Sequence, residues 1–271
     1  MRSSVVGLLL WPALCLAQSP TGHIGTITVN EVEVTSGSEV SSEHLQTITR
    51  EIEGHSNPPS EPEELVERAR YALQREGYFK ADISLANVRS VNPLERTVVM
   101  TLAIHEGQQY RLKRITFTRN KEFPQSQLSQ QFEIADGETF DTEKIRKGLD
   151  QLRKLYATRG YINFTPVPNT EPDEDSGTIT LRTDCDEGKQ FHFGKLAVYG
   201  QELHPGDAEK MIAAWGPYEG KVYDGNELEA FWSEMAPFLP PEWHIDQHLK
   251  VHQDGQSATA DLGVLLPGAN R

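Results

Sequence analysis

Residues 110–117 read Tyr-Arg-Leu-Lys-Arg-Ile-Thr-Phe, and the spacing of their apolar side chains occurs three times in the chain. Residues 27–34 (ITVNEVEV) and 191–198 (FHFGKLAV) place apolar side chains at the same offsets. The copies start 83 and 81 residues apart, which is too regular for chance. Each copy alternates apolar and polar residues, slips by one position and alternates again. This pattern is typical of an extended strand with a bulge or a change of buried face.

The sequence around this strand repeats as well. Two copies carry Glu-Gly three residues before the aromatic residue that opens the strand, as Glu106-Gly107 and Glu187-Gly188. Ahead of each Glu-Gly, residues 98–104 and 179–185 alternate strictly, and residues 260–266 do so near the end of the third copy. A period of two predicts strands with one buried side and one side in water.

Between the strands the apolar residues follow the period of helices. Ser41 and Ser42 can cap a first helix that Gly54 closes, and Pro62 lies in the first turn of a second helix. Asp141 can cap the corresponding second helix of the middle copy.

Both of these second helices end at a Gly-Tyr pair, Gly77-Tyr78 and Gly160-Tyr161, again 83 residues apart. A glycine past the last periodic residue supplies the left-handed conformation that stops a helix, and the aromatic residue opens the next strand. The third copy departs from this pattern. Pro237 and Pro240-Pro241 break its second helix, and the Gly-Tyr pair is missing.

We expect a further strand to join each second helix to the alternating strand. Its inward residues are Phe79, Ala81, Ile83 and Leu85 in the first copy and Trp243, Ile245 and Leu249 in the third, where Asp254-Gly255 makes a hairpin turn. The predicted fold is α+β. It consists of three tandem β-α-α-β-β repeats at residues 22–107, 108–189 and 190–267, the last one divergent, and each is a small three-stranded sheet with two helices on one face.

The composition limits the class of partner. The formal net charge of −14 disfavours nucleic acid, because phosphate binding needs clustered lysines and arginines. Hydrophobic residues make up 37% and charged residues 24% of the chain, which suits a folded protein and argues against wholesale disorder. The simplest role of the acidity is solubility.

Residues 1–17 have the pattern of a secretory signal peptide. Arg2 precedes an apolar run over residues 5–16, which is shorter than the roughly 20 residues of a membrane-spanning helix. We expect cleavage after Ala17. A lipoprotein signal at Cys15 fits less well, because a bulky leucine precedes it. Cys185 is then the single cysteine left, so no intramolecular disulfide can form, and its place in an alternating strand predicts core packing.

The order and spacing of these motifs resemble the POTRA (polypeptide-transport-associated) domains of the outer-membrane protein assembly and two-partner secretion families. The middle copy carries most of the likeness, through residues 115–117, Asn120, the turn 136–141, Gly160-Tyr161 and Asp186-Glu187-Gly188. The first copy matches through Gly77-Tyr78-Phe79 and Glu106-Gly107, and the third through its opening strand and Gly200.

In that family such domains usually precede a membrane-embedded β-barrel, and here residues 268–271 alone follow the third copy. We therefore expect a relative that lacks the C-terminal barrel, either a soluble protein or a fragment whose barrel is encoded elsewhere. The resemblance implies a non-enzymatic scaffold or chaperone-like module in the periplasm of a diderm bacterium, associated with the outer membrane. Its partners would be an outer-membrane β-barrel protein or unfolded outer-membrane polypeptides, bound without a cofactor.

Edge strands suggest how such a module binds polypeptides, because an extended peptide can join a sheet edge through main-chain hydrogen bonds. In the family, the strand after the second helix is the usual docking edge. Pro166 and Pro168 interrupt this strand in the middle copy, which supports an edge position and should block docking there. We therefore expect pairing at residues 79–88 or 243–252. The alternative is that neighbouring repeats cover these edges.

Three other functions stay open on the residues alone. The first is a structural adaptor that docks to a folded outer-membrane barrel and never binds an unfolded client. The second is an orphan envelope hydrolase, although the Gly-x-Ser-x-Gly, His-Glu-x-x-His and phosphate-loop motifs are absent from the sequence. The third is a division-type envelope protein with a related unit, which would normally keep an uncleaved anchor.

Two patterns resemble metal sites. His244, His248 and His252 are four residues apart, but on the expected strand they would lie roughly 13 Å from one another, too far to share one metal. Residues 173–177 (DEDSG) begin like a calcium loop but lack its later glutamate, so we expect a polar turn. No metal site and no catalytic residue are predicted.

Overall fold

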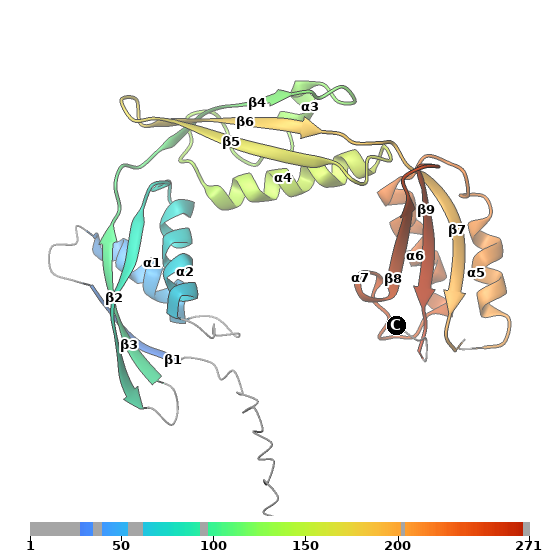
Figure 1. Cartoon of the computed structure of the whole chain (residues 1–271), viewed down its shortest axis with the longest axis horizontal. Coiled ribbons are helices and arrows are strands. Elements are labelled where there is room, and N and C mark those ends of the chain that lie inside the picture. The colour runs from blue at the N-terminus through green and yellow to red at the C-terminus, as the bar shows by residue number, and fades with distance from the viewer. Residues whose placement is uncertain (1–27, 35–39, 54–61, 93–96, 202–203, 268–271) are drawn as a thin grey trace, which may run out of the picture.

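The computed structural model of the chain describes residues 28–34, 40–53, 62–92, 97–201 and 204–267 (Figure 1). The predicted signal peptide and Gly54, the residue expected to close the first helix, lie outside these ranges.

Three separate three-stranded sheets follow one another along the described chain. In each, the strand that comes last in sequence lies in the centre, parallel to the first strand and antiparallel to the second. The middle sheet has the order β4 (Arg111–Thr118), β6 (Thr178–Asp186), β5 (Thr165–Asp173). The others are β1 (Thr28–Val34), β3 (Thr97–His105), β2 (Asp82–Asn92) and β7 (His192–Tyr199), β9 (Thr259–Leu265), β8 (Leu249–Asp254). The predicted α+β fold of three tandem units is confirmed.

The slip in the opening strand of each unit is a break in strand register. β4 passes over Lys113 in its pairing with β6, β1 passes over Asn30, and β7 passes over two residues. In β7 the Asp261 carboxylate enters the gap and accepts the backbone N–H of Lys195 at 2.7 Å. A Cβ atom on Gly194 would overlap that carboxylate, so a larger residue there would displace Asp261 from the bulge.

Each sheet buries one face in a hydrophobic core of its own. Cys185 is 2% exposed, and burial raises the pKa of its thiol to about 11, as expected for a packing residue. Val98, which was expected on the inward face, is half-buried at the margin. The other inward residues of the alternating runs are buried: Met100, Leu102, Ile104, Ile179, Leu181, Thr183, Cys185, Ala260, Leu262, Val264 and Leu266.

The helices of the first two units begin at predicted residues. α1 (Ser42–Glu53) is capped by Ser41, whose hydroxyl accepts the N–H of His44 at 3.1 Å, and α2 (Pro62–Arg75) begins at the predicted proline. α4 (Thr142–Ala157) is capped by Asp141, which accepts two backbone N–H groups at 2.8 and 3.2 Å. α3 (Gln125–Ser129) has five residues, too few to show a helical period in the sequence.

The third unit carries α5 (Asp207–Trp215) and α6 (Gly225–Met235). Pro237 ends α6 as predicted, and Ala236–Phe238 form a 3-10 turn. A short helix, α7 (Ile245–His248), follows where the sequence predicted a strand.

The first Gly-Tyr pair forms the junction between the first and middle units. The Gly77 carbonyl accepts the N–H of Tyr110 at 2.8 Å, and the Gln109 side chain donates to the Glu76 carbonyl at 2.8 Å. Gly77 has φ +90°, and a Cβ atom there would lie 2.6 Å from Thr139 Cγ2. The glycine is therefore required twice, by its backbone conformation and by the closeness of the next unit.

The second Gly-Tyr pair builds an equivalent junction between the middle and third units. The Gly160 carbonyl accepts the N–H of Phe191 at 2.8 Å, and Gln190 donates to the Arg159 carbonyl at 3.0 Å. A Cβ atom on Gly160 would lie 2.6 Å from the Phe191 oxygen and 3.0 Å from Val222 Cγ1. The repeat therefore preserves how units join as well as how each one folds.

The remaining repeated residues hold the loops around these junctions. The Glu187 carboxylate accepts the backbone N–H of Lys121 at 2.7 Å and the Tyr156 hydroxyl at 3.0 Å. Its counterpart Glu106 contacts His44, with 2.7 Å between Oε1 and Nδ1. Tyr78 and Tyr161 pack against the cores of their own units, Gly107 and Gly188 follow the central strands, and Gly200 follows β7.

The three units form an arch, in which the first and third lie on the same side of the middle unit and α4 runs along the inner side (Figure 1). α2 meets α4 at the first junction, where the Tyr71 hydroxyl donates to Glu143. Arg146 holds the same carboxylate with two hydrogen bonds of 2.8 and 2.7 Å. The Arg146 guanidinium, followed by the Tyr71 hydroxyl, lowers the pKa of Glu143 to about 2.

Replacing Gly160 by alanine should destabilise the chain more than the same change at Gly137. Both residues have a left-handed backbone, φ +81° and +87°, which costs an alanine about 1–2 kcal/mol. Only at Gly160 does the new methyl group also meet the next unit, since nothing lies within 4 Å of a Cβ on Gly137. Urea unfolding of both variants measures the difference. Equal midpoints would show that the junction tolerates a side chain.

Acid should release the Tyr71–Glu143 contact at a pH below that at which an ordinary glutamate becomes protonated. Because the folded-state pKa is lowered, the stabilisation is complete above the usual value of 4.5 and is lost as the pH falls through about 2. Small-angle X-ray scattering should find wild-type dimensions constant down to about pH 3, with Glu143→Gln more extended already at pH 6. Glu138→Gln is the control, since its partner Lys144 lies in the same unit. Wild-type dimensions of Glu143→Gln throughout would contradict this.

Candidate functional site

The strand after the second helix lies at a sheet edge in all three units, as β2, β5 and β8. In an antiparallel edge strand, every second residue directs its N–H and C=O away from the sheet. These groups can pair with an extended polypeptide. The candidate site therefore consists of these three edges and the side chains beside them.

The residues expected on the first edge occupy two different places. Ile83 and Leu85 lie in β2 and Ala81 directly precedes it. Ala81 and Ile83 are buried in the core of the first unit, and Leu85 is half-buried against it. Their side chains therefore anchor the strand to the core of its own unit.

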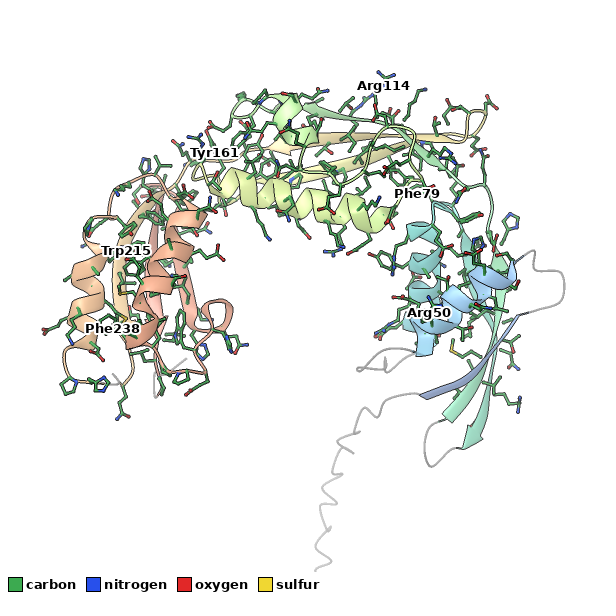
Figure 2. All side chains as sticks on the ribbon, turned by 180° about the vertical axis from the view of Figure 1, so that it is seen from behind. Arg50, Phe79, Arg114, Tyr161, Trp215 and Phe238 are labelled. Carbon is green, nitrogen blue, oxygen red and sulfur yellow. The ribbon has the colours of Figure 1, made fainter. Side chains whose placement is uncertain are left out.

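Phe79 was predicted to open this strand but lies outside β2. It is in the turn between α2 and β2, so the strand begins three residues later than expected, and Gln74 Nε2 donates to the Phe79 carbonyl at 3.2 Å. The Phe79 ring packs edge-on against Phe140 of the middle unit, with 5.5 Å between ring centroids. Figure 2 shows Phe79 at the first junction. The alternating pattern led to a wrong position for Phe79, because a residue that packs on the next unit is as apolar as one that faces the core of its own unit.

The third edge is shorter than predicted. β8 begins at Leu249, which is half-buried, and the backbone of Ile245 belongs to α7. Trp243 precedes this helix, and its indole N–H donates to the Leu265 carbonyl at 3.2 Å, at the end of β9 where a longer β8 would have paired. The tryptophan side chain thus satisfies the carbonyl that the helical turn leaves without a strand partner.

The three histidines do not share a strand. His244 precedes α7, His248 lies in it, and His252 alone belongs to β8. His248 Nδ1 lies 3.1 Å from the His244 carbonyl oxygen. Within the described ranges, no group of three His, Cys, Asp or Glu side chains could hold a metal ion. Nor does any helix in those ranges have the length and apolar character to cross a membrane.

Three prolines show which way the backbone N–H and C=O groups of β5 point. Pro166, Pro168 and Pro172 each lie opposite a buried residue of β6, with no break in register, so they do not interrupt the strand as the sequence suggested. Proline has no N–H for the ladder, so their nitrogen atoms point away from β6, toward the free edge. Over residues 166–172, Thr170 is then the one outward position with an N–H group.

The same register identifies the outward groups of the other edges, because the units share one topology. Arg70 of α2 donates to the Ile83 carbonyl at 2.8 Å, which agrees with an outward direction and covers this end of β2. Val88, 36% exposed, and Val251, 40% exposed, lie beyond such cover. In β2 and β8 the outward positions are again those opposite buried residues of the central strand. They are Ile83, Leu85 and Val88 in β2 and Leu249, Val251 and Gln253 in β8, and no proline is among them.

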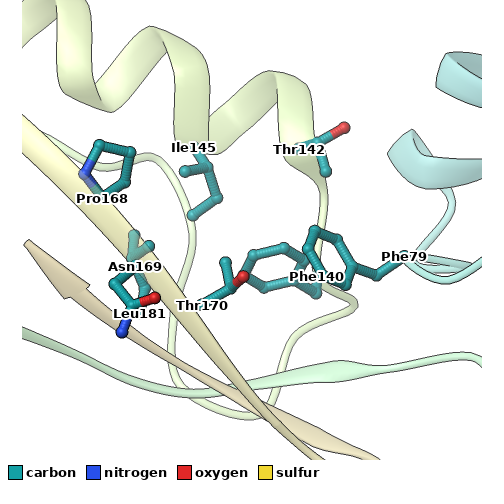
Figure 3. A pocket seen from close by; sticks show the side chains of 8 residues that line it. All are labelled: Phe79, Phe140, Thr142, Ile145, Pro168, Asn169, Thr170 and Leu181. Carbon is teal, nitrogen blue, oxygen red and sulfur yellow. The ribbon is translucent and has the colours of Figure 1, made fainter.

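A groove of about 320 Å³ runs beside β5 and was not predicted from the sequence. α4 forms one wall and β5 the other, and Phe79 reaches in from the first unit (Figure 3). Its surface is mostly apolar, so it suits an apolar side chain rather than an added strand. The lining residues are Phe79, Phe140, Thr142, Ile145, Pro168, Asn169, Thr170 and Leu181.

Comparison with known families identifies the middle unit. Residues 110–188 match the POTRA family model, described as "Surface antigen variable number repeat". The match runs from Tyr110, directly before β4, to Gly188 of the second Glu-Gly pair.

Two curated proteins are similar to parts of the chain. It is 26% identical over 184 residues to the "Putative outer membrane protein assembly factor" of Treponema pallidum (strain Nichols), covering 64% of this chain and 22% of that protein. It is 22% identical over 130 residues to the outer membrane protein assembly factor BamA of Buchnera aphidicola, covering 47% and 20%. The chain thus spans about a fifth of the length of these relatives.

The solved structure of POTRA domains 3–5 of Haemophilus influenzae BamA has the same fold. The TM-score is 0.64 at 17% identity, over 89% of this chain and 96% of that one. The family match thus assigns residues 110–188 to a POTRA domain, and the solved structure shows that the chain has the fold of three POTRA domains in tandem.

Proposed function

We propose that this chain is a non-enzymatic module that binds polypeptides in the periplasm of a diderm bacterium during outer-membrane protein assembly or secretion. The names of its relatives, both outer-membrane assembly factors, support this assignment. Export through a signal peptide at residues 1–17 and units bounded at 22–107, 108–189 and 190–267 belong to the same proposal. Association with the outer membrane would be peripheral.

The proposed binding mode is addition of an extended polypeptide to β2 or β8. The observation that carries it is the contrast between edges: outward proline nitrogens occupy β5, whereas β2 beyond Leu85 and the whole of β8 have no proline. Main-chain pairing depends little on side chains, which suits a site for many client sequences. The edge segments are therefore residues 86–90 and 249–254, which are shorter than the predicted segments 79–88 and 243–252 and end two residues later.

The partner is an unfolded outer-membrane polypeptide, and the edges give the reason. Unpaired outward N–H and C=O groups recognise a chain that has not yet used its own. A structural adaptor for a folded outer-membrane β-barrel protein would not need them. An envelope hydrolase is the remote alternative, which a broad substrate screen tests.

Proline at the outward positions of both free edges should weaken client binding. Val88→Pro and Val251→Pro each remove one outward N–H and copy the arrangement of β5. Each loss should reduce affinity about fivefold, because a net hydrogen bond contributes roughly 1 kcal/mol. Fluorescence anisotropy with a labelled peptide from a barrel strand measures this.

Val88→Ala and Val251→Ala are the matched controls, since they shorten the same side chains and keep the N–H. Thermal unfolding should verify that all four variants keep their fold. Wild-type affinity of the Val88→Pro/Val251→Pro double variant would rule out strand addition at these edges and leave the assembly role itself untouched.

A second measurement separates the client-binding module from the adaptor. The immobilised chain should retain a urea-unfolded outer-membrane barrel protein diluted from denaturant, and should not retain the same protein folded in detergent micelles. Reduced and unfolded serum albumin serves as the control for general stickiness. Retention of the folded barrel alone would establish the adaptor role instead.

A further inference from the structure

A second cavity, of about 350 Å³, lies in the third unit between α6 and the loop that follows it. Trp232 lines it from the helix, Ala236 from the 3-10 turn, and Leu239, Pro240 and Trp243 from the loop. The two tryptophan rings are 5.5 Å apart between centroids and tilted by 42°. The cavity is therefore bounded mainly by aromatic and aliphatic surface.

The cavity occurs where the third unit departs from the repeat. In the other units a Gly-Tyr pair follows the second helix and contacts the next unit. Here Pro237 and Pro240-Pro241 replace that turn, and the loop folds over α6 instead. The sequence that distinguishes this unit from its neighbours is thus the sequence that forms the cavity.

The indole N–H groups of the two cavity tryptophans differ in their surroundings. Trp232 is 5% exposed, and its Nε1–H has no acceptor among the described residues. Trp243, by contrast, uses its indole N–H on the Leu265 carbonyl. Because Nε1 itself is buried, Trp232 contributes ring surface to the cavity rather than a hydrogen bond.

The charge around the cavity favours a cation. Residues 190–267 contain four lysines and no arginine, against twelve aspartates and glutamates. Glu229 lies at the cavity rim, and its exposed carboxylate makes no ion pair with any described residue. Glu242, also exposed, directly follows Pro241 of the lining. Aromatic faces beside a free carboxylate are the combination that recognises organic cations.

We propose that this cavity binds an arginine or lysine side chain of a partner polypeptide. The aliphatic stem lies against Leu239 and Pro240, the charged end meets the tryptophan faces, and Glu229 pairs with it. The site recognises a side chain and needs no free strand edge, so it is independent of the binding mode proposed for β2 and β8.

Nuclear magnetic resonance on the full chain with ¹⁵N-labelled tryptophan tests this directly. The probes are acetyl-Gly-Ser-Arg-Ser-Gly-amide and its citrulline analogue, which keeps the shape of arginine without the charge. Indole signals, assigned through Trp232→Phe and Trp243→Phe, should shift for Trp232 and Trp243 with the arginine peptide, while that of the core residue Trp215 stays in place. The arginine peptide should bind about fivefold to tenfold more tightly than the citrulline peptide.

Glu229→Gln should abolish that preference, and Glu227→Gln, on the same helix but outside the lining, should keep it. Val251→Pro should also keep it, since no strand pairing is involved. Equal affinity for the two peptides, an unchanged preference in Glu229→Gln, or no shift of either cavity tryptophan up to about 10 mM peptide would each overturn the proposal.

Discussion

Each unit places its last strand in the centre of the sheet, and this topology governs the rest of the molecule. The central strand is paired on both sides and alternates strictly, so it fixes which residues enter the core. The two earlier strands must then be edges. Edge strands leave outward backbone groups, which are available to a partner or must be protected in some other way.

The parts of the fold that local chemistry decides could be predicted from the sequence. The slipped strand, the alternating strand and the glycine that ends a helix each leave a pattern a few residues long, and three copies made the pattern reliable. Asp141 and Pro62 marked helix starts for the same reason. The repeated Gly77 and Gly160 were recognised as helix ends, but their closeness to the next unit is a tertiary fact without a local signal.

The candidate site was harder to predict, because it depends on which way the backbone groups of a strand point and on which residues pack against the next unit. Phe79 has the apolar character of an inward strand residue, although it packs on another unit. Trp243, Ile245 and Leu249 have the even spacing of inward strand residues, but the Trp243 indole satisfies the Leu265 carbonyl and permits a helical turn at residues 245–248. Proline was the one useful signal for direction: Pro166 and Pro168 predicted an edge, and Pro172, in the same phase, would have strengthened it.

The edge strands β2, β5 and β8 avoid pairing with other copies of the chain in different ways. Free edges invite pairing between copies of a chain, and β5 prevents it with outward prolines. β2 and β8 lack them, yet β2 has a register break between Leu85 and Asn87 and β8 is only six residues long. A broken edge and a short edge pair poorly with a copy of themselves, and the net charge of −14 adds repulsion between copies. A flexible, unfolded polypeptide can adjust its own backbone to either edge, so these two strands exclude self-association more strongly than they exclude a client.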